Sequence, residues 1–345
     1  GDGTIKFGLM TRGYNTNKSF GVLRKNISSF ADEINPDGTF KVPPVGELYR
    51  NPQTVPESIV GTLNALRLVD YRYNYQANGD WRDTYYRGTY LRQIAGVEFG
   101  PPPTSTGSDN PGTAHNRYNF FDPDNAPYDC TWGRKSFVDG ECRNWGNPFS
   151  ELMAEAYRYL AGAPDPTVTD EDRLDDNEIP GLRVADWNPP TRAPDPDDEE
   201  AVAAAGDLSC INMNVLAFNA SAVSYDGDVL ADATTYHSLR IGKEADDARI
   251  ADLTNDIGDH EGITGGLYFV GSTGAANEDL QCTAKQVTSL AAVRGTCPDA
   301  PRLEGSYLVS GLAHFVKTRD VLEHVPGKNT ISTFGVRLAG DLPNI

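Results

Sequence analysis

Basic residues are scarce in this chain. Among its 345 residues, 30 are Lys or Arg and 49 are Asp or Glu, so the formal net charge is −19. Nucleic-acid binding needs basic patches, and anionic membrane surfaces also attract cationic segments. The charge balance therefore argues against both as partners. Acidity of this size suits an exported protein, and it leaves many carboxylates free for divalent cations.

Long hydrophobic runs are missing as well. No stretch approaches the roughly 18 apolar residues of a membrane span, so we predict no transmembrane helix. The chain starts at Gly1 rather than Met and shows no signal peptide, which we interpret as a processed form or a fragment. With 39% hydrophobic residues the chain can bury a real core. The length suits either roughly two domains or one large domain with insertions, and we take residues 1–345 as a single domain.

Cysteine is sparse and forms no CxxC pair, so a structural zinc site is not expected. The five residues are Cys130, Cys142, Cys210, Cys282 and Cys297. The spacings Cys130–Cys142 and Cys282–Cys297 would each close a short loop, as disulfides in exported proteins often do. Cys210 is left over, either free or paired with a cysteine outside this chain.

Catalytic motifs are also absent. The five His are scattered without an HExxH, and the sequence contains no GxSxG elbow, no P-loop and no GxGxxG. No carboxylate pair stands out in so acidic a chain. We therefore predict a non-enzymatic binding protein without catalytic residues. The enzymatic alternative, a secreted hydrolase on an α/β scaffold, would have to turn over an ester, glycoside or peptide.

The stretch Leu208–Asp228 is the strongest candidate for a site. Its apolar run, Ile211–Phe218, predicts a strand buried on both faces of a mostly parallel sheet. Oxygen-bearing side chains follow directly: Asn219, Ser221, Ser224, Asp226 and Asp228. Ligands bind at the carboxyl ends of strands in open α/β sheets, so this cluster could bind one. The same residue types are also ordinary turn formers.

Helices and strands alternate along the rest of the chain. The patterns predict strands over 4–11 and 330–340, a buried strand over 261–271, and helices over 56–71, 143–162, 244–257 and 303–320, with a short helical stretch between Cys282 and Cys297. In the first helix, Thr54 and Glu57 have capping-box spacing, and Leu63 falls on the inward stripe. In the second helix, Asn147 can cap and Gly162 can end the helix, and an apolar stripe is formed by Phe149, Leu152, Met153, Ala156, Tyr157 and Leu160. In the last helix, the residues expected to face inward are Leu308, Leu312, Phe315 and Val316. This alternation predicts an α/β fold with a doubly wound, mostly parallel sheet.

Two long segments break the pattern. Residues 72–129 are rich in Tyr, Asn, Gly and Pro without a sustained period, and we predict a long irregular insertion over 72–144 that holds one candidate disulfide. Residues 165–207 contain 14 Asp or Glu, three Arg and six Pro. This composition predicts a solvated acidic loop on the surface.

Several stretches are similar to the type IV pilus tip-associated adhesin and assembly family, PilY. They are Phe7–Ile27, Trp145–Gly162, Asp176–Pro190, Ala220–Asp228, Asn255–Gly271 and Leu303–Val336. In that family a von Willebrand factor A-like domain precedes a C-terminal propeller. The resemblance implies that this chain is the N-terminal von Willebrand A-like domain, and it covers nearly the whole sequence.

The resemblance also implies a location and partners. The protein would be extracellular, at the pilus tip on the bacterial surface, and would act in adhesion, pilus assembly and surface contact. Its partners would be minor pilins or a tip complex, together with a host or abiotic surface ligand. The alternative is an exported structural subunit of a surface filament without an adhesin role.

Von Willebrand A domains hold a divalent cation with a DxSxS motif, but this chain contains no copy of it. The sequence also reads Asn219–Ala220–Ser221 where a later metal-site Asp would be expected. The candidates for a Ca²⁺ or Mg²⁺ site are therefore Ser221, Ser224, Asp226 and Asp228.

Overall fold

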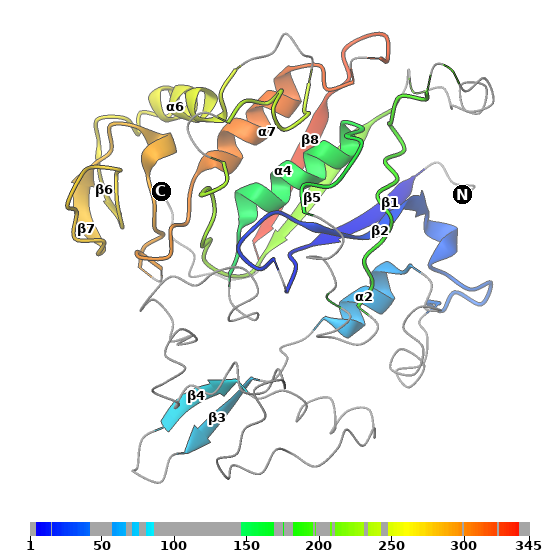
Figure 1. Cartoon of the computed structure of the whole chain (residues 1–345), viewed down its shortest axis with the longest axis horizontal. Coiled ribbons are helices and arrows are strands. Elements are labelled where there is room, and N and C mark those ends of the chain that lie inside the picture. Colours follow the sequence, from blue (N-terminus) through cyan, green and yellow to red (C-terminus); the bar gives the residue numbers. More distant parts are fainter. Residues whose placement is uncertain are drawn as a thin grey trace.

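The computed structural model of the chain combines helices with short two-stranded sheets (Figure 1). It describes residues 5–14, 16–41, 57–66, 71–75, 81–85, 146–168, 175, 182–195, 197, 208, 211–230, 234–242, 248–298, 300–322 and 324–337. The strands are β1 (Lys6–Thr11), β2 (Val22–Ser29), β3 (Tyr71–Tyr75), β4 (Trp81–Tyr85), β5 (Met213–Asn219), β6 (Leu267–Val270), β7 (Thr283–Gln286) and β8 (Ile331–Arg337). The helices are α2 (Ile59–Ala65), α4 (Phe149–Leu160), α6 (Ile250–His260) and α7 (Leu308–Thr318), with single 3₁₀ turns at Phe30–Asp32 and Leu290–Ala292.

The prediction of a mixed α/β chain with parallel strands is confirmed, because β5 and β8 pair in parallel from Met213↔Ile331 to Asn219↔Arg337. The other described pairs, β1–β2, β3–β4 and β6–β7, are antiparallel. No described helix lies between the two strands of an antiparallel pair, whereas α6 and α7 separate β5 from β8 in the sequence, as the crossover between parallel strands requires. The described strands therefore form neither a mostly parallel nor a doubly wound sheet.

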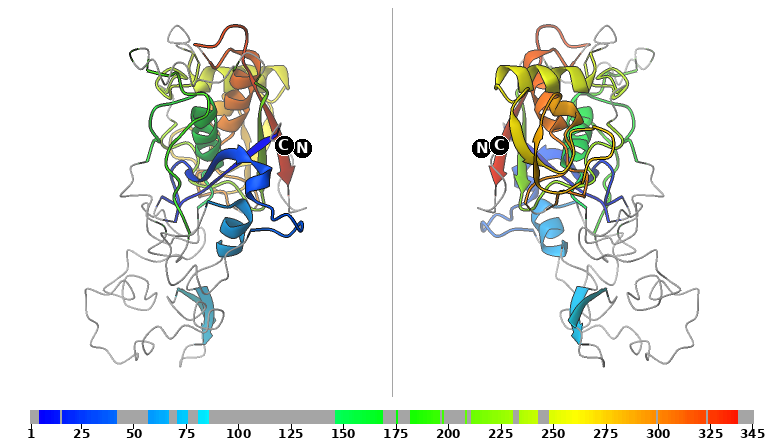
Figure 2. Two further views of the ribbon diagram at one scale, coloured as in Figure 1. Left: turned by 90° about the vertical axis from the view of Figure 1, so that its right-hand side faces the viewer. Right: turned by 90° about the vertical axis from the view of Figure 1, so that its left-hand side faces the viewer.

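The main core lies between the β5–β8 sheet and helices α4 and α7. Met213 and Ile331 are buried on the sheet. The predicted inward residues of α7, Leu308, Leu312, Phe315 and Val316, are all buried. Tyr157 of α4 lies within hydrogen-bonding distance of Thr333 on β8, at 2.8 Å between the two oxygens. Both helices lie on the same side of the sheet (Figure 2).

Strand β5 is not buried on both faces, contrary to the prediction. Its exposure alternates, and Leu216 and Phe218 keep exposed fractions of 58% and 60%. The apolar run indicated a strand correctly, but periodicity alone does not tell whether a second layer covers the outer face.

Helix α4 is buried almost all round. Met153, Tyr157 and Leu160 of the predicted stripe are buried, and so are three charged residues, Glu151, Glu155 and Arg158, for which the pattern predicts exposure. Arg158 Nε lies 3.0 Å from Glu155 Oε2. The arginine also donates to the carbonyls of Leu239 and Asp165. The loops that follow α4 and precede α6 therefore enclose its polar side.

The acidic segment 165–207 is not simply a surface loop. Leu182, Ala185, Trp187 and Thr191 are buried, and the Ala185 amide donates to the carbonyl of Leu23 on β2. The Trp187 ring packs edge-on against Tyr159 of α4, with ring centroids 5.1 Å apart. The composition of the whole segment is dominated by its acidic residues, so it did not indicate the few residues that are buried. Residues 198–207 lie outside the described residues.

Helix α2 is shorter than predicted and begins after Ser58, whose hydroxyl accepts from the Gly61 amide. Glu33 adds a carboxylate at the same end, accepting from the Ile59 amide at 2.9 Å. Leu63, placed inward by the sequence pattern, is 54% exposed. Thr54 of the predicted capping box lies outside the described residues.

Part of the predicted irregular insertion 72–144 is regular, because β3 and β4 form a hairpin from Tyr71↔Tyr85 to Tyr75↔Trp81. Cys130, Cys142 and Cys210 lie outside the described residues, so their predicted states are not tested. Within the described ranges, no helix has both the length and the apolar composition needed to cross a membrane.

Candidate functional site

The oxygen-rich loop after β5 packs against the N-terminal end of α4. Asn147 makes most of the contacts there: its side-chain amide donates to Asn219 Oδ1 at 3.0 Å and to Ser221 Oγ at 3.1 Å. The Asn147 backbone amide donates to Ser224 Oγ at 3.0 Å. Pro148, not Asn147, is the N-cap residue of α4. Asn147 therefore fixes the loop to the helix instead of capping it.

Asp226 caps α4 from a distant part of the sequence. Its side chain is fully buried and accepts from the backbone amides of Ser150 and Glu151. Two hydroxyls complete the set, Ser150 Oγ at 2.7 Å and Ser306 Oγ at 2.8 Å. Because helical N-termini carry unpaired amides and partial positive charge, a carboxylate is well suited to this position. Burial raises the pKa of Asp226 to about 6, although these hydrogen bonds oppose the shift.

Glu151 lies beside Asp226 and connects two loops. Its Oε2 accepts from the Phe20 amide at 3.1 Å, and its Oε1 accepts from the Gly227 amide at 3.1 Å. Burial, followed by repulsion from Asp228 and Asp226, raises the pKa of Glu151 to about 9. The carboxyl is therefore protonated at neutral pH, which limits the charge in this acidic junction.

This junction predicts a specific pH dependence of stability. The pKa of Glu151 is about 9 in the folded chain against an ordinary value of 4.5, so the folded state binds more protons between these values. The free energy of unfolding must then fall as the pH rises through this window. Asp226 contributes in the same direction. Its pKa is raised from 3.8 to about 6 in the folded chain, so the free energy of unfolding also falls as the pH rises from 3.8 to about 6. We expect Glu151→Gln, which stays neutral, to flatten the decline between pH 6 and 9 in urea titrations.

Asp256→Asn is a suitable control for this measurement, because its carboxylate lies on α6, away from the junction. In this control, the free energy of unfolding should fall with pH as steeply as in the wild type. Parallel pH profiles of wild type and Glu151→Gln would contradict a protonated Glu151.

The four predicted cation ligands differ in their burial and in their partners. Asp226 and Ser224 are buried and engaged with α4 and Asn147, whereas Ser221 and Asp228 lie at the surface. Asp228 Oδ2 lies 3.9 Å from Lys18 Nζ. Across the described ranges, no group of three or more His, Cys, Asp or Glu could hold a metal ion. The Ca²⁺ or Mg²⁺ site on Ser221, Ser224, Asp226 and Asp228 therefore stays an untested prediction.

A second candidate surface lies on the hairpin of β6 and β7. The sequence predicts a buried strand over 261–271, but Leu267 is 72% exposed and Phe269 is 67% exposed. They adjoin an apolar pocket of about 370 Å³. Its lining includes Ile263, Leu267, Phe269, Leu290, Pro298 and Tyr307. A concave apolar surface of this volume lies within the range of small binding pockets.

Buried apolar residues and a disulfide form the base of this pocket. Val270, Val287, Leu290 and Val293 form a small buried core beneath it. A disulfide joins Cys282 to Cys297, the pair predicted from their spacing, and both residues contribute to the lining. The hairpin is thereby tied covalently to the segment that precedes α7.

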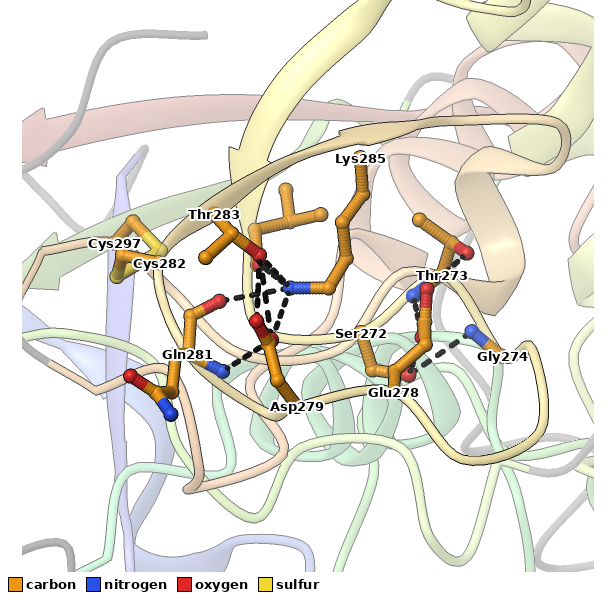
Figure 3. A network of polar contacts seen from close by, with 11 residues as sticks. Ser272, Thr273, Gly274, Glu278, Asp279, Gln281, Cys282, Thr283, Lys285 and Cys297 are labelled. Atoms are coloured by element: carbon orange, nitrogen blue, oxygen red, sulfur yellow. Dashed lines mark hydrogen bonds and ion pairs between the residues drawn. A yellow bond between two sulfur atoms is a disulfide. The ribbon is translucent and has the colours of Figure 1, made fainter.

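A polar network shapes the loop between β6 and β7 (Figure 3). Lys285 Nζ donates to Asp279 Oδ1 and to the Gln281 carbonyl, both at 2.8 Å. The hydrogen bond from Lys285 is the main cause that lowers the pKa of Asp279 to about 2. At the other end of the loop, Glu278 accepts from Ser272 Oγ at 2.6 Å and from the Thr273 amide at 2.7 Å. The exposed side chains of Leu267 and Phe269 thus lie next to a loop that is stabilised by hydrogen bonds within the loop and to β7.

Sequence reasoning located the loop after β5 but missed its partners. Ser150 and Ser306 lie 76 and 80 residues from Asp226, and no local signal links them. The sequence predicts a buried strand over 261–271, and nothing in it indicates that Leu267 and Phe269 of β6 are exposed. Only the short spacing between Cys282 and Cys297 pointed to the second surface.

The comparisons with known proteins agree on one family. A family model described as "PilY1 homolog, second domain" matches residues 7–99 and 112–316. The chain is also 25% identical over 351 residues to the "Type IV pilus biogenesis factor PilY1 homolog" of Xylella fastidiosa (strain Temecula1 / ATCC 700964). That match covers 98% of this chain and 19% of the relative, so the chain spans about a fifth of the relative's length. No solved structure matches the chain significantly.

Proposed function

Because the chain belongs to the family of PilY1-homolog second domains, we propose that it is a non-enzymatic binding domain of a type IV pilus biogenesis factor. The family match over residues 7–99 and 112–316 is the observation that carries this proposal. The name of the curated relative supports the part in type IV pilus biogenesis. The family description counts the matched region as a second domain, so an N-terminal von Willebrand A-like domain stays a prediction.

We place the protein outside the cell, in the pilus tip, where it acts as an adhesin and in pilus assembly. Its proposed partners are minor pilins or the tip complex, and a host or abiotic surface. The Cys282–Cys297 disulfide supports an oxidising, exported location. The homology supports pilus components as partners.

The β6–β7 hairpin is the surface that best suits such binding. Aromatic and aliphatic side chains on a rigid support are typical anchors of protein interfaces. Leu267 and Phe269 have this character, and the pocket beside them is lined mainly by apolar groups. The buried acids Glu151 and Asp226 do not line this pocket and are engaged in structural hydrogen bonds. This division favours recognition over catalysis.

The double variant Leu267→Ser/Phe269→Ser tests the proposal in cells. We expect it to reduce adhesion or the yield of sheared pili. Both side chains are mostly exposed, so the free energy of unfolding should change by only about 0.5 kcal/mol. Leu63→Ser, which alters an exposed leucine of α2, is the matched control and should behave like wild type.

Normal pili and normal adhesion in the double variant would contradict a binding role for the hairpin. An antibody against this chain, applied to the sheared pilus fraction, tests the location independently. Absence from that fraction would overturn the tip assignment. Assembly of the purified chain into fibres would favour the filament-subunit alternative.

A further inference from the structure

The apolar pocket beside β6 and β7, which we call the hairpin pocket, has two walls from different parts of the chain. Leu267 and Cys282 belong to the β6–β7 hairpin and its loop, whereas Cys297 and Pro298 belong to the segment that precedes α7. The Cys282–Cys297 disulfide is therefore a covalent bond from one wall to the other. Figure 3 shows this bond beside the polar network of the hairpin loop.

A short backbone bridge also joins the two walls. Ser272 and Arg294 exchange hydrogen bonds of 2.7 and 2.9 Å, and the Gly271 amide donates to the Gly295 carbonyl at 3.3 Å. The approach is close, because a Cβ on Gly271 would overlap the carbonyl oxygen of Pro301. A short two-stranded pairing is only marginally stable in water, so the bridge depends on what holds its two sides together.

The apolar support of the hairpin is separate from the main core. Val270, Val287, Leu290 and Val293 form a cluster of their own, distinct from the cluster around α4 and α7. Local opening of a small unit costs less free energy than unfolding of the whole chain. Separation of the two walls would therefore leave α4 and α7 in place, and the disulfide is the covalent restraint against it.

We propose that the Cys282–Cys297 disulfide is a redox-sensitive switch of the hairpin pocket: its reduction by a dithiol lets the two walls separate while the main core stays folded. Cys282 is half-buried, whereas Cys297 is only 8% exposed. A thiolate of the dithiol attacks the Cys282 sulfur and forms a mixed disulfide with it, and the Cys297 sulfur leaves as a thiolate that takes up a proton. The second thiol of the reductant then displaces the Cys282 sulfur. The dithiol is thereby oxidised to its disulfide, and both cysteines are reduced.

The consequence of this switch for partner binding rests on the proposed function. Preorganised binding surfaces gain affinity because less ordering is needed on binding. Once the walls separate, Leu267 and Phe269 no longer lie against a fixed Pro298, so a partner of the hairpin would bind the oxidised state better. The separation of the walls itself requires no pilus partner.

Hydrogen exchange of the purified protein, measured by mass spectrometry with and without dithiothreitol, tests the switch. We expect reduction to accelerate exchange about tenfold or more in the peptides that contain Ser272 and Arg294, because the cross-link suppresses local opening. Peptides of α4 and α7 should exchange at the same rate in both states. Unchanged exchange at Ser272 and Arg294 would overturn the proposal. An equal acceleration in α7 would also overturn it, because the bond would then stabilise the whole fold.

The double variant Cys282→Ala/Cys297→Ala separates this bond from the other three cysteines of the chain. Its peptides with Ser272 and Arg294 should exchange rapidly without reductant and should not respond to dithiothreitol. A response as large as that of the wild type would assign the effect to the other cysteines and overturn the proposal. If the variant does not fold, the comparison of oxidised and reduced wild type decides. Neither measurement involves pili, so a failure of the switch is distinguishable from a failure of the proposed function.

Discussion

Replacing Arg24 with Met is expected to lower the free energy of unfolding by about 3–5 kcal/mol, because it leaves a buried carboxylate without its counter-ion. The Arg24 and Asp175 side chains are both fully buried, and Nη2 of the arginine lies 2.5 Å from Oδ2 of the aspartate. Arg24 also donates to Thr11 Oγ1 at 2.8 Å and to the carbonyl of Arg183 at 3.0 Å. One guanidinium therefore joins β1, β2 and the acidic segment.

Urea denaturation of the purified chain measures this effect, with Arg249→Met as the control. Arg249 pairs with Asp252 at 2.6 Å, but both side chains are about half exposed (51% and 48%). Water screens such a pair, so the control should cost less than about 1 kcal/mol. Equal losses in the two variants would contradict the buried role of Arg24. The double variant Arg24→Met/Asp175→Leu should recover part of the stability, since it removes both charges.

Asp226→Ala is the second large effect that we expect, a loss of about 3 kcal/mol, because buried donors lose their acceptor. The Ser150 and Glu151 amides and the Ser150 and Ser306 hydroxyls all donate to this carboxylate. Water cannot easily replace it, since Asp226 has no exposed surface. The substitution also removes the negative charge at the N-terminus of α4. The helical signal and the urea concentration at the unfolding midpoint should both fall.

The neighbouring Asp228→Ala is the matched control, because its side chain is 44% exposed and its ion pair with Lys18 spans 3.9 Å. We expect a change of less than about 1 kcal/mol there. Asp226→Asn keeps the shape and gives a second measurement if the alanine variant does not fold. A wild-type midpoint in both Asp226 variants would show that the carboxylate does not hold the end of α4.

Local patterns in the sequence correctly predicted several elements. The stripe Leu308–Val316 of α7 is buried as expected, because a helix placed against a core must turn its apolar side inward. The end of α4 also follows from the sequence: Gly162 has a φ of +78°, a conformation that favours glycine. The strands β1 and β8 lie within the predicted ranges 4–11 and 330–340. The resemblance to the PilY family, inferred from several stretches of the sequence, agrees with the family whose model matches the chain.

Contacts between distant segments were decided only by the tertiary structure. Arg24 and Asp175 are separated by 151 residues, and the charge of each alone predicts a solvated side chain. Whether one or both faces of a strand are buried depends on which helices pack against it. The apolar run of β5 is compatible with both arrangements, and only one face is buried. The sequence offered Asp226 as a cation ligand, which stays untested, whereas its contact with the N-terminal end of α4 depends on Ser150 and Ser306. Periodicity reports how a segment presents its side chains, whereas their partners are set by how the whole chain packs.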